Sequence, residues 1–60
     1  MTKEEIIKLR KSLGLTQEQF ARRLKLAYNT ISSWERGLFS PSPLALEKLK
    51  RLQKRNEKTN

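Results

Sequence analysis

Five polar side chains recur at the spacing of one helical face near the middle of the chain. Asn can form two hydrogen bonds with the edge of adenine, Ser can donate to or accept from several bases, and a Tyr ring can pack on the methyl group of thymine. The strip contains no acid, and its small polar groups allow close approach to a base. These residue types favour contacts with nucleic-acid bases, and the strip comprises Tyr28, Asn29, Ser32, Ser33 and Arg36.

Basic residues flank this strip along the sequence. Arg22, Arg23 and Lys25 precede it and Arg36 closes it, where phosphates would lie beside an inserted helix. The whole chain has 14 Lys and Arg against 6 acids, a net charge of +8, which favours nucleic acid, an anionic membrane surface or an acidic protein as partner. The alternative is an ordinary solvated surface, with Asn29 capping a helix that begins one turn later.

The composition excludes several classes of protein. Without Cys or His, the chain has no disulfide, no thiolate nucleophile and none of the commonest zinc ligands. It also lacks the G-x-S-x-G and S-x-x-K motifs and a Gly-rich phosphate loop, so we expect neither an enzyme nor a cofactor. A chain of 60 residues has room for one small core. No apolar run approaches membrane-spanning length, and the charged start is unlike a signal peptide, which favours a cytoplasmic domain.

Two helices are predicted before the strip, each with a capping box at its start. The first runs from about Lys3 to Leu13 and the second from about Gln17 to Leu24. In each, a Thr precedes the helix and a Glu or Gln follows three residues later, so that side chains and backbone N–H groups satisfy each other. Gly14 suits the left-handed conformation after the first helix. The apolar faces consist of Ile6, Leu9, Leu13, Phe20, Ala21 and Leu24.

Two further helices are predicted after a short turn. An apolar line at helical spacing predicts a third helix before Gly37, and only residues 25–28 separate it from the second. Two short helices so closely joined form a helix-turn-helix unit. Ser42 and Pro43 begin a fourth helix that frays beyond Arg55. The resulting fold class is all-α, and the apolar positions of these two helices are Ala27, Ile31, Trp34, Leu38, Ala45, Leu46, Leu49 and Leu52.

Two charged side chains fall on the apolar faces. In helical projection Arg10 lies between Leu9 and Leu13, and Glu35 lies beside Trp34. A single inward charge is costly, whereas two opposite charges can satisfy each other. The period therefore predicts a partly buried Arg10–Glu35 ion pair between the first and third helices. The alternative is that each side chain extends separately to solvent over its apolar neighbours.

Residues 15–24, LTQEQFARRL, and residues 30–37, TISSWERG, followed by Pro41, closely resemble the lambda-repressor/Cro-like helix-turn-helix family, also called the xenobiotic-response-element type. The resemblance spans about residues 6–52. It implies a domain of four or five helices in a sequence-specific transcriptional regulator. In that family the third helix enters the major groove of double-stranded DNA, usually as a homodimer on an inverted repeat.

The resemblance also implies roles for individual residues. Base edges would be met by Tyr28, Asn29 and Ser33, with Ala27 and Ser32 nearby. Arg10 and Glu35 match the ion pair of the family, and Gln17 would contact a phosphate and brace the third helix. The expected phosphate contacts are Thr16, Gln17, Arg22, Arg36, Ser40 and Ser42.

Three features depart from the family pattern. Lys25 occupies a turn position that is most often Gly, so a non-Gly residue would adopt a left-handed conformation at some cost. Ala27 replaces the usual Ser or Thr cap of the third helix, which weakens that terminus or transfers capping to a neighbour. The loop of residues 38–43 lacks the usual Lys or Arg, so phosphate contacts there would come from backbone N–H groups, Ser40 and Ser42.

Two other functions remain open at this point. An antitoxin-like module, which could also bind DNA, would grip an acidic protein through exposed Leu38 and Phe39 and the leucine face of the fourth helix. Against this, a Phe beside prolines can fold back as a lid on the core. The basic fourth helix would also suit RNA or an anionic membrane, but its leucines are needed to close a small core.

Overall fold

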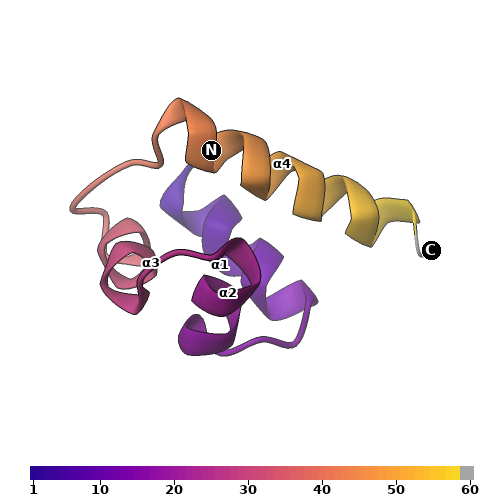
Figure 1. The fold of residues 1–60 in the computed structure, drawn as a ribbon, viewed down its shortest axis with the longest axis horizontal. Coiled ribbons are helices and arrows are strands. Elements are labelled where there is room, and N and C mark those ends of the chain that lie inside the picture. The colour runs from indigo at the N-terminus through magenta and orange to yellow at the C-terminus, as the bar shows by residue number, and fades with distance from the viewer. Residues whose placement is uncertain (59–60) are drawn as a thin grey trace.

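A computed structural model describes the backbone of residues 1–58 and the side chains of residues 1–55. It contains four helices, α1 (Lys3–Ser12), α2 (Gln17–Leu24), α3 (Tyr28–Glu35) and α4 (Pro43–Lys58). Helix α4 extends along one side of the other three (Figure 1). The described residues form helices and their connections only, which confirms the all-α prediction. None of these helices is long and apolar enough to cross a membrane.

The helix boundaries agree with the sequence prediction except at two C-termini. Helix α1 ends at Ser12, one residue early, with Leu13 as its cap. The fourth helix, which was expected to fray beyond Arg55, extends to Lys58, and no helix-breaking residue follows Pro43 to end it earlier. The last residues of the expected frayed tail, 59–60, lie outside the described residues.

Both predicted capping boxes are present. At α1, the backbone N–H of Thr2 donates to Glu5 Oε1 at 2.7 Å and that of Glu5 donates to Thr2 Oγ1 at 3.2 Å. At α2, Thr16 and Gln19 make the same exchange at 2.9 and 3.1 Å. Ser42 caps α4 by accepting from the backbone N–H of Ala45 at 3.3 Å. These side chains fix where three of the four helices begin.

All four helices contribute to one hydrophobic core. Within it, α3 packs on α1 and on α2. The leucine face that was considered for a partner protein lies in this core, where Leu49 is fully buried and Leu52 is 8% exposed. That interpretation of α4 is therefore wrong. The buried residues are Ile6, Leu9, Phe20, Ala21, Leu24, Ile31, Trp34, Ala45, Leu49 and Leu52.

Two residues of the predicted third apolar line are exposed instead of buried. Ala27 precedes the first turn of α3, and Leu38 is 58% exposed in the loop that follows. The helical period places a residue correctly only inside the helix, and α3 comprises just Tyr28–Glu35. Leu26, which the pattern did not select, packs against the core from the turn before α3.

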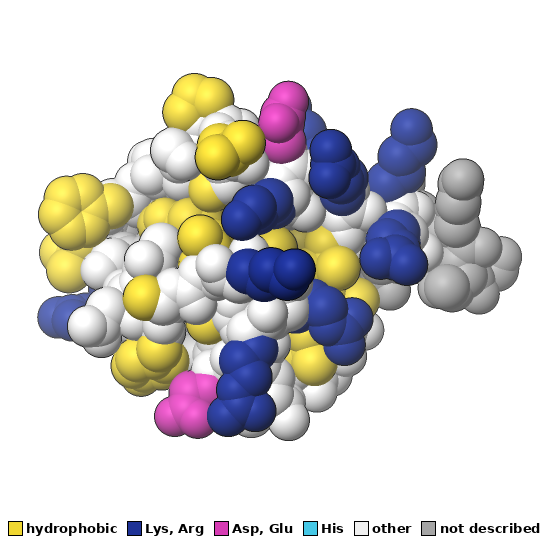
Figure 2. All heavy atoms as spheres, in the orientation of Figure 1, with side chains coloured by type: hydrophobic (Ala, Val, Ile, Leu, Met, Phe, Trp, Pro, Cys, Tyr) yellow, Lys and Arg dark blue, Asp and Glu magenta, His cyan; other side chains and the backbone are white. Residues whose placement is uncertain are grey.

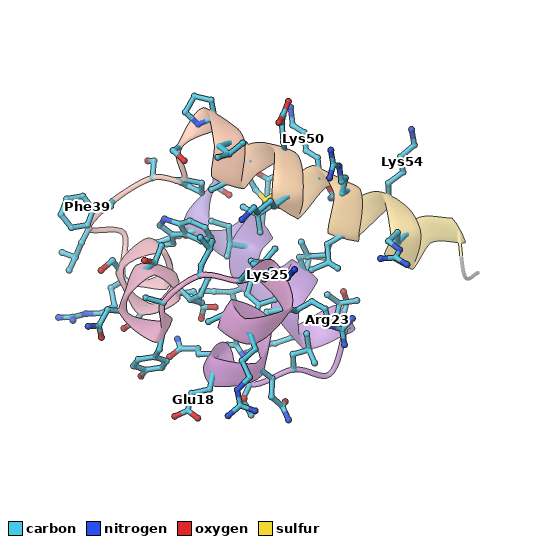
Figure 3. The ribbon with its side chains drawn as sticks, viewed as in Figure 1. Glu18, Arg23, Lys25, Phe39, Lys50 and Lys54 are labelled. Carbon is cyan, nitrogen blue, oxygen red and sulfur yellow. The ribbon has the colours of Figure 1, made fainter. Side chains whose placement is uncertain are left out.

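The loop between α3 and α4 holds Phe39 away from the core. Its side chain is 70% exposed and projects into solvent at the α3 end of the molecule (Figure 3). A core lid formed by Phe39 is therefore contradicted. Trp34 is buried nearby and Met1 packs against the core beside it, so the core at this end is closed without Phe39. Gly37, at φ +77°, reverses the chain at the start of this loop.

Candidate nucleic-acid interface

The polar strip predicted for α3 lies on the surface of that helix. Ile31 and Trp34 point into the core, so the remaining faces of α3 are turned outward. Asn29 and Arg36 are exposed, Tyr28 is 47% exposed, and both serines are half-buried. The strip is therefore one continuous, acid-free surface that runs from the first turn of α3 to its C-cap.

The predicted ion pair between Arg10 and Glu35 is present and is bidentate. Arg10 Nε donates to Glu35 Oε2 at 2.7 Å, and Arg10 Nη2 donates to Oε1 at 3.1 Å. The Glu35 and Arg10 side chains are only 6% and 15% exposed. A bidentate, largely desolvated pair has defined geometry, so it fixes the end of α3 against α1.

Two further hydrogen bonds extend this pair into a network. Gln17 Nε2 donates to Glu35 Oε1 at 3.0 Å, and Arg10 Nη1 donates to the carbonyl oxygen of Leu15 at 2.9 Å. The network thus joins α1, the start of α2 and the end of α3. Gln17 braces α3 as the resemblance implied. The sequence did not reveal the role of the Leu15 carbonyl, because every residue has a backbone carbonyl and the residue type does not show which one accepts a hydrogen bond.

The start of α2 presents backbone donors beside this network. The first turn of any helix leaves N–H groups without helical partners. Here the capping box occupies the N–H groups of Thr16 and Gln19, which leaves those of Gln17 and Glu18 for an external acceptor. Glu18 is exposed in the same turn and its carboxylate extends away from the molecule (Figure 3). This carboxylate opposes the approach of an anion.

The other residues expected to contact phosphate lie in separate places. Arg22 is exposed on α2, and Ser40 is exposed in the loop after α3. The Ser42 hydroxyl oxygen accepts the capping bond of α4, and its hydrogen remains free to donate to another partner. Ala27 is exposed and is the N-cap of α3, and its methyl group cannot accept a hydrogen bond. The predicted weakness of this helix terminus is therefore present.

Two of the basic residues expected to flank the strip are directed elsewhere. Arg23 and Lys25 line a groove with α4 instead, because each step along a helix turns the side chain by about 100° and α2 ends between them. Most of the visible Lys and Arg side chains gather over α4 and the end of α2 (Figure 2). Positive charge is therefore concentrated away from α3. Among the described residues, no three potential metal-ligating side chains come together.

Comparisons with known proteins agree with this geometry. The profile of a helix-turn-helix family matches residues 6–52. An uncharacterized HTH-type transcriptional regulator of Methanothermobacter thermautotrophicus is 43% identical over 42 residues, which cover 70% of this chain. The match covers 61% of that relative, less than two thirds of its length. No solved structure matches the chain with significance.

Proposed function

The chain belongs to the lambda-repressor/Cro-like helix-turn-helix family, and from this we propose that it is a sequence-specific regulator of transcription that inserts α3 into the major groove of double-stranded DNA. The observation that carries the proposal is the exposed, acid-free strip on α3, held by a buried ion pair. A rigid helix that presents short polar side chains suits direct reading of base edges.

Base recognition is assigned to the strip itself. Asn29, exposed in the first turn of α3, would form the paired hydrogen bonds that distinguish adenine. Ser32 and Ser33 would donate to or accept from neighbouring bases. The Tyr28 ring and the Ala27 methyl group would contact thymine methyl groups. Each residue lies on α3 or at its N-cap, so a single insertion brings them all to the bases.

Phosphate contacts are assigned to the two ends of this surface. The amide of Gln17 carries two hydrogens, of which one bonds Glu35 and the other would reach a phosphate. The Thr16 hydroxyl and the free N–H groups of the first turn of α2 would bind the same group. Arg22 and Arg36 would supply charge, and Ser40 and Ser42 would hydrogen-bond a phosphate beyond α3.

We also propose that two copies bind an inverted repeat, with the α3–α4 loop at the contact between them. Leu38 and Phe39 are 58% and 70% exposed, and a second copy would remove this apolar surface from water. The same exposed surface would suit contact with another protein in an antitoxin-like module. Analytical sedimentation with and without DNA distinguishes self-association from that alternative by the mass of the complex. A dimer on DNA supports self-association. A monomer on DNA would leave the loop for another protein.

Selection from random DNA duplexes tests the proposed function. We expect enrichment of an inverted repeat whose half-sites lie about one helical turn apart. Asn29→Ala and Ser33→Ala should relax base preference at defined positions by roughly 1–3 kcal/mol each. Gln53→Ala, an exposed position on α4, is the control and should leave the selected sequence unchanged. No enrichment, or identical preferences in all variants, would contradict base reading by α3.

A further inference from the structure

A groove of about 500 Å³ lies between the C-terminal end of α2 and α4. Its floor consists mainly of the aliphatic stems of basic side chains, which can cover apolar surface while their charges stay in water, above the nearly buried core residues Leu24 and Leu52. No acid lines it. The cations around it are Arg23, Lys25, Lys48, Arg51, Lys54 and Arg55. We call this feature the basic groove.

The basic groove is separate from the strip on α3. Its walls come from the end of α2 and the middle and end of α4, and no residue of α3 lines it, although α3 follows the end of α2 after a short turn (Figure 1). Figures 2 and 3 show the Lys and Arg side chains of this region, including Arg23 and Lys25, gathered away from the α3 end. A DNA duplex on α3 would leave the groove open.

The groove cations form no ion pair among the described side chains, and the nearest described acid on their helix, Glu47, lies on the adjoining surface beside Arg51 and Lys54. Among the side chains that the structure describes, the Arg10–Glu35 pair is the one ion pair, so the groove cations repel one another. Lys48, Arg51 and Arg55 share one face of α4 at spacing i, i+3 and i+7. Lys48 Nζ donates to the Leu24 carbonyl oxygen at 3.2 Å and thereby fixes α4 on the end of α2.

Lys25 supplies an independent argument. It ends α2 in the left-handed conformation, at φ 58° and ψ 44°, which Gly adopts without cost and Lys does not. Backbone strain of this kind suggests a functional reason for the side chain. The side chain of Lys25 lines the basic groove, so the strained position adds a charge there.

We propose that the basic groove binds an acidic amphipathic segment of a partner protein. Several carboxylates along one segment match cations that extend over two turns of α4, and one or two apolar side chains of the segment would cover the floor. A helix laid into such a groove is a common recognition mode. Single-stranded nucleic acid fits less well, because the groove contains no aromatic side chain on which unpaired bases could stack.

Titration with a synthetic peptide tests this proposal. The probe is an amphipathic helical peptide of about 15 residues, with Glu on one face and Leu at helical spacing on the other. We expect amide NMR shifts in the full chain to change at the end of α2 and along α4, not in α3. A second peptide, with the Leu residues replaced by Gln, should bind more weakly because it cannot cover the apolar floor.

Variants of the chain separate the groove from general attraction. Combined Arg51→Glu and Arg55→Glu should weaken peptide binding about tenfold or more, because like charges then face each other. Lys50→Glu makes the same type of charge change on α4, outside the groove, and should change it by less than about threefold. Lys25→Gly should raise the melting temperature yet weaken peptide binding, which a merely structural role would not produce.

Several results would overturn the proposal. One is an equal loss of peptide binding in the Lys50→Glu variant and the groove variants. Others are peptide-induced shifts centred on α3, and unchanged peptide binding by Lys25→Gly. Mixed-sequence single-stranded RNA and anionic phospholipid vesicles serve as competitors. If either displaces the peptide and binds the same variants more weakly, that ligand, and not a protein segment, is the occupant of the groove. Every groove variant is expected to keep its binding to duplex DNA. A failure of peptide binding can therefore be distinguished from a failure of the DNA-binding proposal.

Discussion

Glu35 accepts hydrogen bonds from two elements with a single carboxylate. Arg10 approaches from α1 and Gln17 from the start of α2, so each oxygen of this nearly buried group has a partner. Paired charges in such a site are tolerated, whereas an unpaired one is costly. These hydrogen bonds to one carboxylate therefore hold α3 in a fixed position relative to α1 and the start of α2.

Removal of Glu35 should therefore unfold much of the population. Glu35→Ala leaves the Arg10 guanidinium without its partner, and we expect a loss of about 3–5 kcal/mol in the free energy of unfolding, which is large for a small domain. Urea denaturation measures this loss. The double variant Arg10→Met and Glu35→Leu should lose less than the sum of the single variants. A loss below about 1 kcal/mol for Glu35→Ala would mean that the pair behaves as a surface ion pair.

Glu18 is expected to weaken DNA binding. Its exposed carboxylate lies in the first turn of α2, beside the N–H groups to which we assign a phosphate. Glu18→Gln removes the repulsion and should tighten binding to duplexes of any sequence by a few-fold, with a larger effect at low salt. Glu47→Gln, on α4, is the matched control in fluorescence-anisotropy titrations. Equal tightening in both variants would show that only net charge matters.

The start of most helices in this protein depends on the residue type at the N-cap. Three helices begin at a Thr or Ser that accepts a backbone hydrogen bond. Helix α3 instead has Ala27 as its N-cap, although it is one of the two shortest helices described. Its position therefore depends on burial of Ile31 and Trp34 and on the Glu35 network, more than on its own propensity.

A better cap should stabilise α3. Ala27→Ser supplies the missing acceptor for a first-turn N–H, and we expect a gain of about 0.5–2 kcal/mol in thermal or urea unfolding. Ala27→Asp should give a similar gain, since a negative charge also favours a helix N-terminus. In the proposed DNA complex that negative charge would lie against an anionic duplex, so duplex affinity should fall more for Asp than for Ser. An equal affinity for both variants would place Ala27 away from the DNA.

The capping box of α1 should add a pH-dependent contribution. Hydrogen bonds from the backbone of Thr2, and secondarily from its side chain, lower the pKa of Glu5. A carboxyl group with a lowered folded-state pKa stabilises the fold above its ordinary pKa and loses this effect as pH falls through the lowered value. Thermal melts of the parent and Glu5→Gln should therefore differ at neutral pH and converge in acid. A difference independent of pH would contradict this assignment.

Across the whole molecule, positive charge and the recognition surface are separated. The net charge is +8, but Arg10 is engaged by Glu35 and six other cations line the basic groove, to which α3 contributes no residue. The charge therefore attracts polyanions in general, and the nearly uncharged strip on α3 would choose among DNA sequences. If both proposals hold, one chain would bind DNA through α3 and an acidic protein segment through the basic groove at the same time.

The salt dependence of duplex binding should reflect this separation. With about 4–8 phosphates contacted per protomer, log K should fall against log salt with a slope of about −4 to −7. Arg36→Ala should reduce the size of the slope by about 1. Arg51→Ala, in the groove, should leave it nearly unchanged, and titrations at several salt concentrations compare the two. An equal reduction of the slope in both variants would mean that DNA also contacts α4.

The amino-acid sequence by itself determined the elements, their caps and the ion pair. Thr, Ser, Gly and Pro act on the backbone within a few residues, so the capping boxes follow from local chemistry, whereas the left-handed Lys25 was expected only from the resemblance to the family. The Arg10–Glu35 pair, although distant in sequence, was predictable because two inward charges of opposite sign need each other. The polar strip proposed to contact bases follows from the same period, as the outward remainder of α3.

Only the tertiary structure decided what lies outside the helical period and what several elements build together. Phe39 and Leu38 are exposed because the loop after Gly37 leaves the core, and Leu26 packs inward from a turn. The basic groove exists because α4 rests on the end of α2, with Lys48 bound to the Leu24 carbonyl. Periodicity describes one helix at a time, whereas a groove depends on the angle and distance between two, which packing alone sets.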